Sequence, residues 1–197
     1  MKVGILGGTF DPVHNGHLTL AASAQDALQL DTVLFIPAGD PWRKNDRQIT
    51  PAAHRLAMLR LAIESNDAFG VSDIELRRDG PTYTADTLEA LAGERLDDEF
   101  YFIIGADALE DLPNWHEPER IVEHAMLAVA PRDTQDVNSV AVNITGVAER
   151  IVTFDMPRVA VSSTEIRERA AAGKSVHGLV PDAVERYIRE QGLYEAG

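Results

Sequence analysis

The feature that most constrains this chain is a strand, a turn and a helix that follow one another at its start. Residues 3–6 form a short apolar run, which predicts a buried parallel strand. Residues 18–28 place Leu20, Ala24 and Leu28 at helical spacing. The turn between them therefore lies beyond the carboxyl end of a strand, which is where open α/β sheets bind ligands.

The residue types in this turn favour phosphate binding. Gly7 and Gly8 allow a phosphate to approach the main chain closely, and the following helix start offers free N–H groups and a positive dipole end. His14 and His17 lie three residues apart, so both can point at the same phosphates. Two simpler interpretations are a plain tight turn and half of a zinc site. The chain has no cysteine and no third ligand at suitable spacing, so we expect no metal site here.

The rest of the chain alternates between strand and helix patterns. Strands are predicted at residues 32–37, 69–76, 100–105, 126–130 and 151–154. Helices are predicted from Thr50, as a cap, to 63, and at 84–91, 117–124, 162–173 and 181–192. This alternation predicts an α/β fold with one doubly wound, Rossmann-like parallel sheet, helices on both faces and the C-terminal helices packed on the nucleotide-binding domain. We expect residues 1–197 to form a single domain, and residues 132–148 permit no prediction.

The charge and the apolar pattern narrow the partners. The formal net charge is −14, from 18 Lys and Arg against 32 Asp and Glu, which argues against a nucleic-acid or anionic membrane surface. Phosphate substrates would need local positive charge, for which Arg43, Lys44, Arg47, Arg132 and Arg167 are candidates. The chain has no run of membrane-spanning length and no apolar signal region, and we expect a cytoplasmic protein.

The string from Gly7 to His17 resembles the signature of the HxGH nucleotidyltransferases, with His14-Asn15-Gly16-His17 as the HxGH element. Four more stretches resemble those of one branch, the nicotinate-nucleotide (nicotinic acid mononucleotide) adenylyltransferases. They are Ser162-Ser-Thr-Glu-Ile-Arg167, Pro41-Trp-Arg-Lys44, Gly80-Pro-Thr-Tyr-Thr84 with its continuation to Leu88, and Gly105-Ala-Asp107 with Leu112-Pro-Asn-Trp-His116. Arg43 stands where many members have histidine, which leaves its role open.

The resemblance implies transfer of AMP from ATP to nicotinate mononucleotide, which gives deamido-NAD and pyrophosphate. Because the mononucleotide phosphate can itself attack the α-phosphorus, no protein nucleophile is needed, and the site must align two anions and stabilise charge. The expected catalytic residues are His14, His17, Lys44 and Arg167. The expected ATP-binding residues are Gly8, Thr9, Phe10, His14, Gly16, His17, Gly105, Asp107, Ser163, Thr164 and Arg167. The expected mononucleotide-binding residues are Lys44, Tyr83, Thr84, Trp115 and His116.

Several alternatives stay open. Trp115 could be a core residue, Asp107 a helix cap and Arg167 a surface arginine on a well-capped helix. The same scaffold could act on nicotinamide mononucleotide or phosphopantetheine, transfer CMP, or serve as a non-catalytic nucleotide-binding regulator. Residues 82–88 and 112–115 favour a pyridine nucleotide, and the histidines argue against a pure binder. Mg²⁺ is expected with ATP, held mainly by phosphates and water. The oligomeric state is not predicted.

Overall fold

The computed structural model describes residues 1–39, 49–131, 144 and 146–195. Its strands are β1 (Lys2–Gly8), β2 (Thr32–Pro37), β3 (Phe69–Val71), β4 (Glu99–Gly105), β5 (Ala125–Ala130) and β6 (Ile151–Thr153). Its helices are α1 (Asn15–Leu28), α2 (Ala52–Ile63), α3 (Thr84–Glu94), α4 (Ala106–Asp111), α5 (Pro118–His124), α7 (Ser163–Ala171) and α8 (Asp182–Glu190), with 3-10 turns η1 (Leu112–Asn114) and η2 (Ala148–Arg150). In the described part of the chain, no helix is long and apolar enough to cross a membrane.

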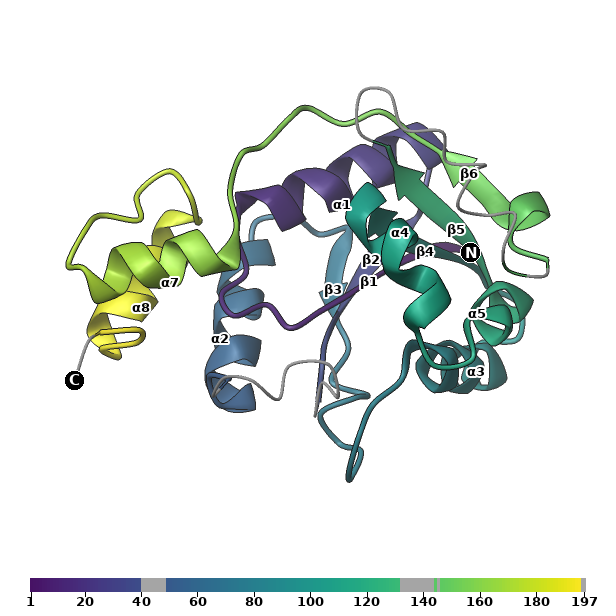
Figure 1. The fold of residues 1–197 in the computed structure, drawn as a ribbon, viewed down its shortest axis with the longest axis horizontal. Helices are drawn as coiled ribbons and strands as arrows, with labels where there is room; N and C mark the ends of the chain where they lie inside the picture. Colours follow the sequence, from purple (N-terminus) through teal and green to yellow (C-terminus); the bar gives the residue numbers. More distant parts are fainter. Residues whose placement is uncertain (40–48, 132–143, 145, 196–197) are drawn as a thin grey trace.

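The described strands form one sheet in the order β3-β2-β1-β4-β5-β6 (Figure 1), and every pairing is parallel. Ile5 of β1 pairs with Leu34 on one side and with Phe102 on the other. The chain first builds outward from β1 through β2 to β3, and then returns to add β4 beside β1. The strand order therefore reverses between β1 and β4, and the crevice beyond their carboxyl ends is the expected ligand site.

Helices cover both faces of the sheet, as the alternating pattern predicted. Helices α3, α4 and α5 pack on one face, with Leu88, Leu109 and Ile121 in one apolar cluster. On the other face Met58 of α2 and Ile188 of α8 belong to a second cluster, which also receives residues of α1 and α7. The doubly wound, Rossmann-like fold is confirmed, including the docking of the C-terminal helices on the domain (Figure 1).

Several boundaries differ from the prediction, each for a local reason. Helix α1 begins at Asn15 rather than residue 18, because His14 adopts the extended backbone of a cap. Helix α2 is preceded by Pro51 as the cap, so Thr50 does not cap it. Strand β3 spans only Phe69–Val71, since its partner β2 pairs with those three residues alone.

Three short elements were missed, and one cap was predicted correctly. Helix α4 and turn η1, between β4 and α5, and turn η2, before β6, have too few residues to show a helical period. The predicted capping box at the start of α7 is present in part, because the Ser162 hydroxyl accepts a hydrogen bond from the Glu165 N–H at 3.1 Å.

Candidate active site

A pocket of about 400 Å³ lies beyond the carboxyl ends of β1 and β4. Residues that the sequence singled out line much of it, namely Gly8, Thr9, His17, Tyr83, Thr84, Gly105, Trp115 and His116. The pocket is also lined by Glu75 and Thr82 and by apolar residues such as Leu6, Phe102 and Ile104, which were not predicted as site residues. The pocket lies where the strand order reverses, which is the location expected for a nucleotide site in this fold.

The turn between β1 and α1 is held in place because the side chain of Phe10 is buried in the core. Phe10 is 1% exposed and adopts a φ of 48°, a left-handed conformation that is uncommon for a non-glycine residue. Its ring lies over Gly8, where a Cβ atom would come within 3.1 Å of it. The same ring meets His17 edge-on, with 5.0 Å between ring centroids. The Phe10 side chain therefore supports His17. This leaves the main chain of Phe10 to contact a ligand.

The two histidines of the turn form one unit. Their rings stack at a centroid distance of 3.7 Å and an interplanar angle of 20°. The His14 main-chain N–H donates to Nδ1 of His17 at 3.2 Å. Since Nδ1 of His17 accepts, the proton of a neutral His17 ring resides on Nε2. His17 lines the pocket, so it can present a donor to a phosphate oxygen there.

His14 is the buried partner of this pair. Its side chain is 8% exposed, and burial lowers its pKa to about 4, so the ring is neutral at pH 7. Among the described residues, Nδ1 of His14 has no hydrogen-bond partner. A Cβ on Gly16 would lie 3.1 Å from this nitrogen and 3.1 Å from Val161, so the glycine lets the ring fit tightly against the helix start.

Helix α7 is hydrogen-bonded directly to the turn between β1 and α1. The Ser163 hydroxyl donates to the Pro12 carbonyl at 2.9 Å, and Nη1 of Arg167 donates to the Asp11 carbonyl at 2.7 Å. Nη2 of Arg167 also donates to the Thr164 hydroxyl at 3.0 Å. The structure therefore brings three residues predicted to bind ATP beside the signature turn, although they do not line the pocket itself.

The end of the chain closes on the same turn. The Tyr194 hydroxyl donates to the carboxylate of Asp11 at 2.8 Å, and Asp11 is 1% exposed. Burial and the neighbouring Asp11 raise the pKa of Tyr194, which therefore stays a hydrogen-bond donor.

Arg55 of α2 is a support that sequence reasoning missed. It is 2% exposed, and its guanidinium donates to the carbonyls of Thr50 and Thr9, both at 2.9 Å, and of Gly39 at 3.5 Å. Burial lowers its pKa, and the nearby Asp11 opposes this shift. Arg55 thus links the Thr9 carbonyl to the carbonyl of Gly39, which precedes residues 40–48, and to that of Thr50, which follows them. The predicted Lys44, together with Arg43, falls in that segment and lies outside the described residues.

The opposite end of the pocket is formed by the start of α3 and the segment after η1. Tyr83 caps α3 and Thr84 is its first residue, so the helix start faces the pocket. Trp115 is half-buried, meets Phe102 edge-on at 6.0 Å, and donates from its indole N–H to Asp111 at 3.1 Å. Trp115 is therefore both a core contact and a pocket wall.

Two further residues complete this description. Gly105 ends β4 and caps α4, and the predicted Asp107 lies in the first turn of α4 with an exposed side chain. Glu75 is 8% exposed, and its carboxylate accepts a hydrogen bond from the Thr87 hydroxyl at 2.9 Å. Burial raises the pKa of Glu75. No local pattern marks Glu75, because only the folded chain brings it to the pocket.

Comparison with known proteins gives consistent results. The chain matches the cytidylyltransferase-like family over residues 5–169. It is 45% identical over 195 residues to a probable nicotinate-nucleotide adenylyltransferase of Thermomicrobium roseum, covering 98% of this chain and 91% of that protein. It is 47% identical over 200 residues to a protein of the same description from Dehalococcoides mccartyi, covering 98% and 97% of the two chains.

Solved structures also match along the whole chain. The nicotinic acid mononucleotide adenylyltransferase of Plasmodium falciparum complexed with NaAD superimposes with a TM-score of 0.81 at 20% identity, covering 98% of this chain and 97% of that one. The same enzyme complexed with APC gives a TM-score of 0.79 at 19% identity, covering 98% and 96%. At these identities the likeness establishes a shared fold.

Proposed function

The chain belongs to the nicotinate-nucleotide adenylyltransferase family, within the cytidylyltransferase-like proteins, and on that premise we propose that it transfers AMP from ATP to nicotinate mononucleotide. The products are deamido-NAD and pyrophosphate, so the reaction is a step of NAD biosynthesis. The proposal rests on one observation, which is that a single pocket is lined by His17, by Thr84 at the start of α3 and by Trp115. We call the part around His14, His17 and residues 8–10 the phosphate end, and the part around Thr84, Trp115 and His116 the pyridine end.

The phosphate end supplies the charge stabilisation that the reaction needs. An oxygen of the mononucleotide phosphate attacks the α-phosphorus, a new P–O bond forms, and the bond to the pyrophosphate oxygen breaks. His17 donates from Nε2 to the oxygens on which charge develops, and the stacked, neutral His14 fixes its orientation. Thr9 and Phe10, held by Arg55 and by the core, offer main-chain groups to ATP.

Positive charge in this proposal comes from Arg167 and Lys44. Arg167 reaches the turn at Asp11 from α7, next to Ser163 and Thr164, and suits phosphate oxygens because its guanidinium can donate two bonds at once. Lys44 lies outside the described residues, and its role rests on the resemblance of its loop. Residues 1–197 are proposed to act as one nucleotidyltransferase domain.

The pyridine end supplies recognition of the acceptor. Trp115 offers a ring face or edge for the pyridine, and Tyr83 and His116 pack together at 4.1 Å beside it. The start of α3 offers N–H groups, the Thr84 hydroxyl and a positive dipole end. This arrangement favours a carboxylate over a neutral amide, and so nicotinate mononucleotide over nicotinamide mononucleotide.

Mg²⁺ enters this proposal as a companion of ATP. Among the described residues that line the pocket, the only carboxylate is that of Glu75, which is buried and bonded to Thr87. Among the described residues, a metal-capable trio occurs only at His177, Asp182 and Glu185, outside the pocket. The residues that line the pocket therefore fit a Mg²⁺ ion held mainly by the phosphates and water. When bound, such an ion would neutralise phosphate charge. We propose that the reaction takes place in the cytoplasm, where ATP is available.

A pyrophosphate-release assay with a panel of substrates tests the function. ATP with nicotinate mononucleotide should give the highest kcat/KM, ahead of nicotinamide mononucleotide and of phosphopantetheine, and CTP should not replace ATP. Pyrophosphate release with a different acceptor, and not with nicotinate mononucleotide, would assign that acceptor as the substrate. Binding of ATP without release under any combination would instead support a non-catalytic regulator.

A further inference from the structure

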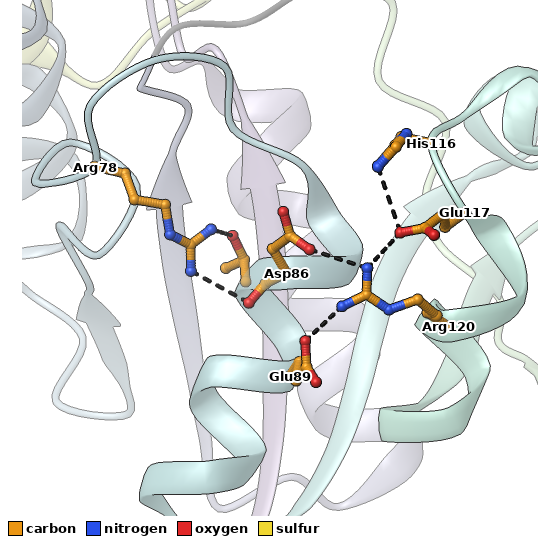
Figure 2. A network of polar contacts seen from close by, with 7 residues as sticks. Arg78, Asp86, Glu89, His116, Glu117 and Arg120 are labelled. Atoms are coloured by element: carbon orange, nitrogen blue, oxygen red, sulfur yellow. Dashed lines mark hydrogen bonds and ion pairs between the residues drawn. The ribbon is translucent and has the colours of Figure 1, made fainter.

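A cluster of charged side chains outside the pocket joins the two walls of its pyridine end. Figure 2 shows Arg120 of α5 surrounded by carboxylates. Its Nη1 contacts Asp86 at 3.1 Å and also Glu117, and its Nη2 contacts Glu89 at 2.5 Å. Asp86 and Glu89 belong to α3, whereas Glu117 is the cap of α5. One guanidinium therefore bridges two elements that are separated by more than twenty residues of chain.

The bridged elements are those that form the pyridine end. Asp86 lies in the first turn of α3, two residues after Thr84. Glu117 directly follows His116, and the two side chains approach within 3.4 Å. His116 in turn packs against Tyr83, the cap of α3. Arg120 thus closes a ring of contacts that runs around the pocket wall without lining the pocket itself.

The first turn of α3 is also held from its other side. Arg78 donates to the Asp86 carbonyl at 3.2 Å, as Figure 2 shows, and to the Thr87 hydroxyl at 3.1 Å. Thr87 in turn donates to Glu75 at 2.9 Å. Because this side is fixed by Glu75 and Arg78, a change at Arg120 should move the segment of Trp115 and His116 relative to α3 rather than unfold the helix start.

Removing Arg120 would change the sign of the force between the walls. With the guanidinium present, each carboxylate is attracted to the same cation. Without it, two carboxylates on α3 face one on α5, and like charges repel. Asp86 would also stand uncompensated at a helix start that is proposed to receive an anion. The Arg120 side chain is 28% exposed, so solvent reduces the size of each interaction without changing its sign.

We propose that Arg120 is a positioning residue for acceptor recognition, which holds Trp115 and His116 against the start of α3 and keeps Asp86 neutralised. The proposal rests on the proposed function for the identity of the acceptor. It predicts an effect on acceptor binding and on the preference for the acid, with little effect on ATP.

The first test is Arg120→Met, which keeps most of the length and removes the charge. The KM for nicotinate mononucleotide should rise about three- to tenfold, with the KM for ATP and kcat within about twofold of the parent. The preference for the acid over the amide should fall by a similar factor. The matched control is Arg95→Met, because Arg95 pairs with Asp98 at the far end of α3 and is 31% exposed. Equal effects of both variants, or equal changes for ATP and the acceptor, would overturn the proposal.

A second test uses the predicted change of sign. In the parent protein, Glu117→Gln removes an attraction and should raise the KM for the acceptor. In Arg120→Met, the same substitution removes a repulsion and should lower it. A purely structural role for Arg120 would make Glu117→Gln harmful or neutral in both backgrounds, and that result would refute the proposal.

A third test needs no activity, so it separates this proposal from the proposed function. The chain has two tryptophans, and Trp42→Phe leaves Trp115 as the only one. In that background, Arg120→Met should increase quenching of Trp115 fluorescence by acrylamide, and Arg95→Met should not. If Arg120→Met fails to fold, Glu117→Gln in the same background serves instead. Unchanged quenching in the folded variant would overturn the positioning role.

Discussion

The two ends of the pocket are built in different ways. The phosphate end comes from one continuous stretch of chain and is fixed by burial, with Phe10 at 1% and His14 at 8% exposure. The pyridine end comes from separate segments, at α3 and after η1, and its outer side is joined by partly exposed charges around Arg120. The two histidines proposed to act on the transition state are thus held mainly by packing, which water does not weaken. The groups proposed to select the acceptor are held partly by ion pairs, which water and salt do weaken.

The largest expected effect is at the phosphate end. His17→Ala should lower kcat by roughly two to three powers of ten, because it removes a donor aimed at the transition state. The fold should persist, since His17 lies at the pocket surface. His177→Ala, which changes an exposed histidine, is the control and should leave kcat unchanged. Near-normal turnover of His17→Ala would remove the main functional difference between the two ends.

The next effect concerns the charge of the acceptor and tests the pyridine end. The value of kcat/KM should favour nicotinate mononucleotide over nicotinamide mononucleotide by roughly a hundredfold, equivalent to about 2.7 kcal/mol. A carboxylate can accept charge-assisted bonds from Thr84 and the helix start, whereas the amide must turn its NH₂ group towards a donor. Thr84→Val should reduce the ratio. Equal kcat/KM values for the two mononucleotides would refute a carboxylate site at the start of α3 and leave adenylyl transfer intact.

Burial of His14 predicts a pH dependence of stability that originates at the phosphate end. Its pKa is about 4 in the folded protein and near the ordinary 6.5 when unfolded. Between these values the unfolded chain binds the proton and the folded one does not, so falling pH favours unfolding. The loss at pH 4.5 relative to pH 7 should be about 2 kcal/mol in the free energy of unfolding.

Urea unfolding of the parent and of His14→Gln at both pH values isolates this contribution, because the other titrating groups are common to both. The loss of stability on going to pH 4.5 should be smaller in His14→Gln. The same loss in both proteins would show that His14 does not titrate in this range. His14 would then not be the desolvated partner that distinguishes the phosphate end.

The smallest effect that we predict here is at Trp115. Trp115→Ala should raise the KM for nicotinate mononucleotide by about tenfold, the order expected for a lost base-stacking contact, with the KM for ATP little changed. Trp115→Phe should recover most of the affinity, since it keeps an aromatic face. Because Trp115 also contacts Phe102, a melting curve of Trp115→Ala must accompany the kinetics. Loss of the folded state would mean that its core role dominates.

Much of the fold could be predicted because local sequence patterns indicate most of its strands and helices. Apolar runs of strand length alternate with helical periods, and such an alternation buries its apolar faces between a parallel sheet and the helices that cover it. The signature turn lies directly after the first strand, so its placement at the ligand crevice follows from the strand's direction. Short elements such as α4 and η1 were not predicted, because they carry too few residues to show a period.

The sequence by itself determined most of the strands and helices, the turn proposed to bind phosphate and the closeness of His14 to His17, because each depends on residues that are close neighbours in the chain. Only the tertiary structure decided which distant groups support them. Arg167 reaches Asp11 across 156 residues, and Arg55 reaches Thr9 across 46. The same holds for Glu75 in the pocket and for Arg120 among its carboxylates. In sequence, Arg55, Glu75 and Arg120 look like ordinary solvent-facing positions, whereas Arg167 was identified through its motif. Their partners are set by how the helices dock, which is a long-range property of packing.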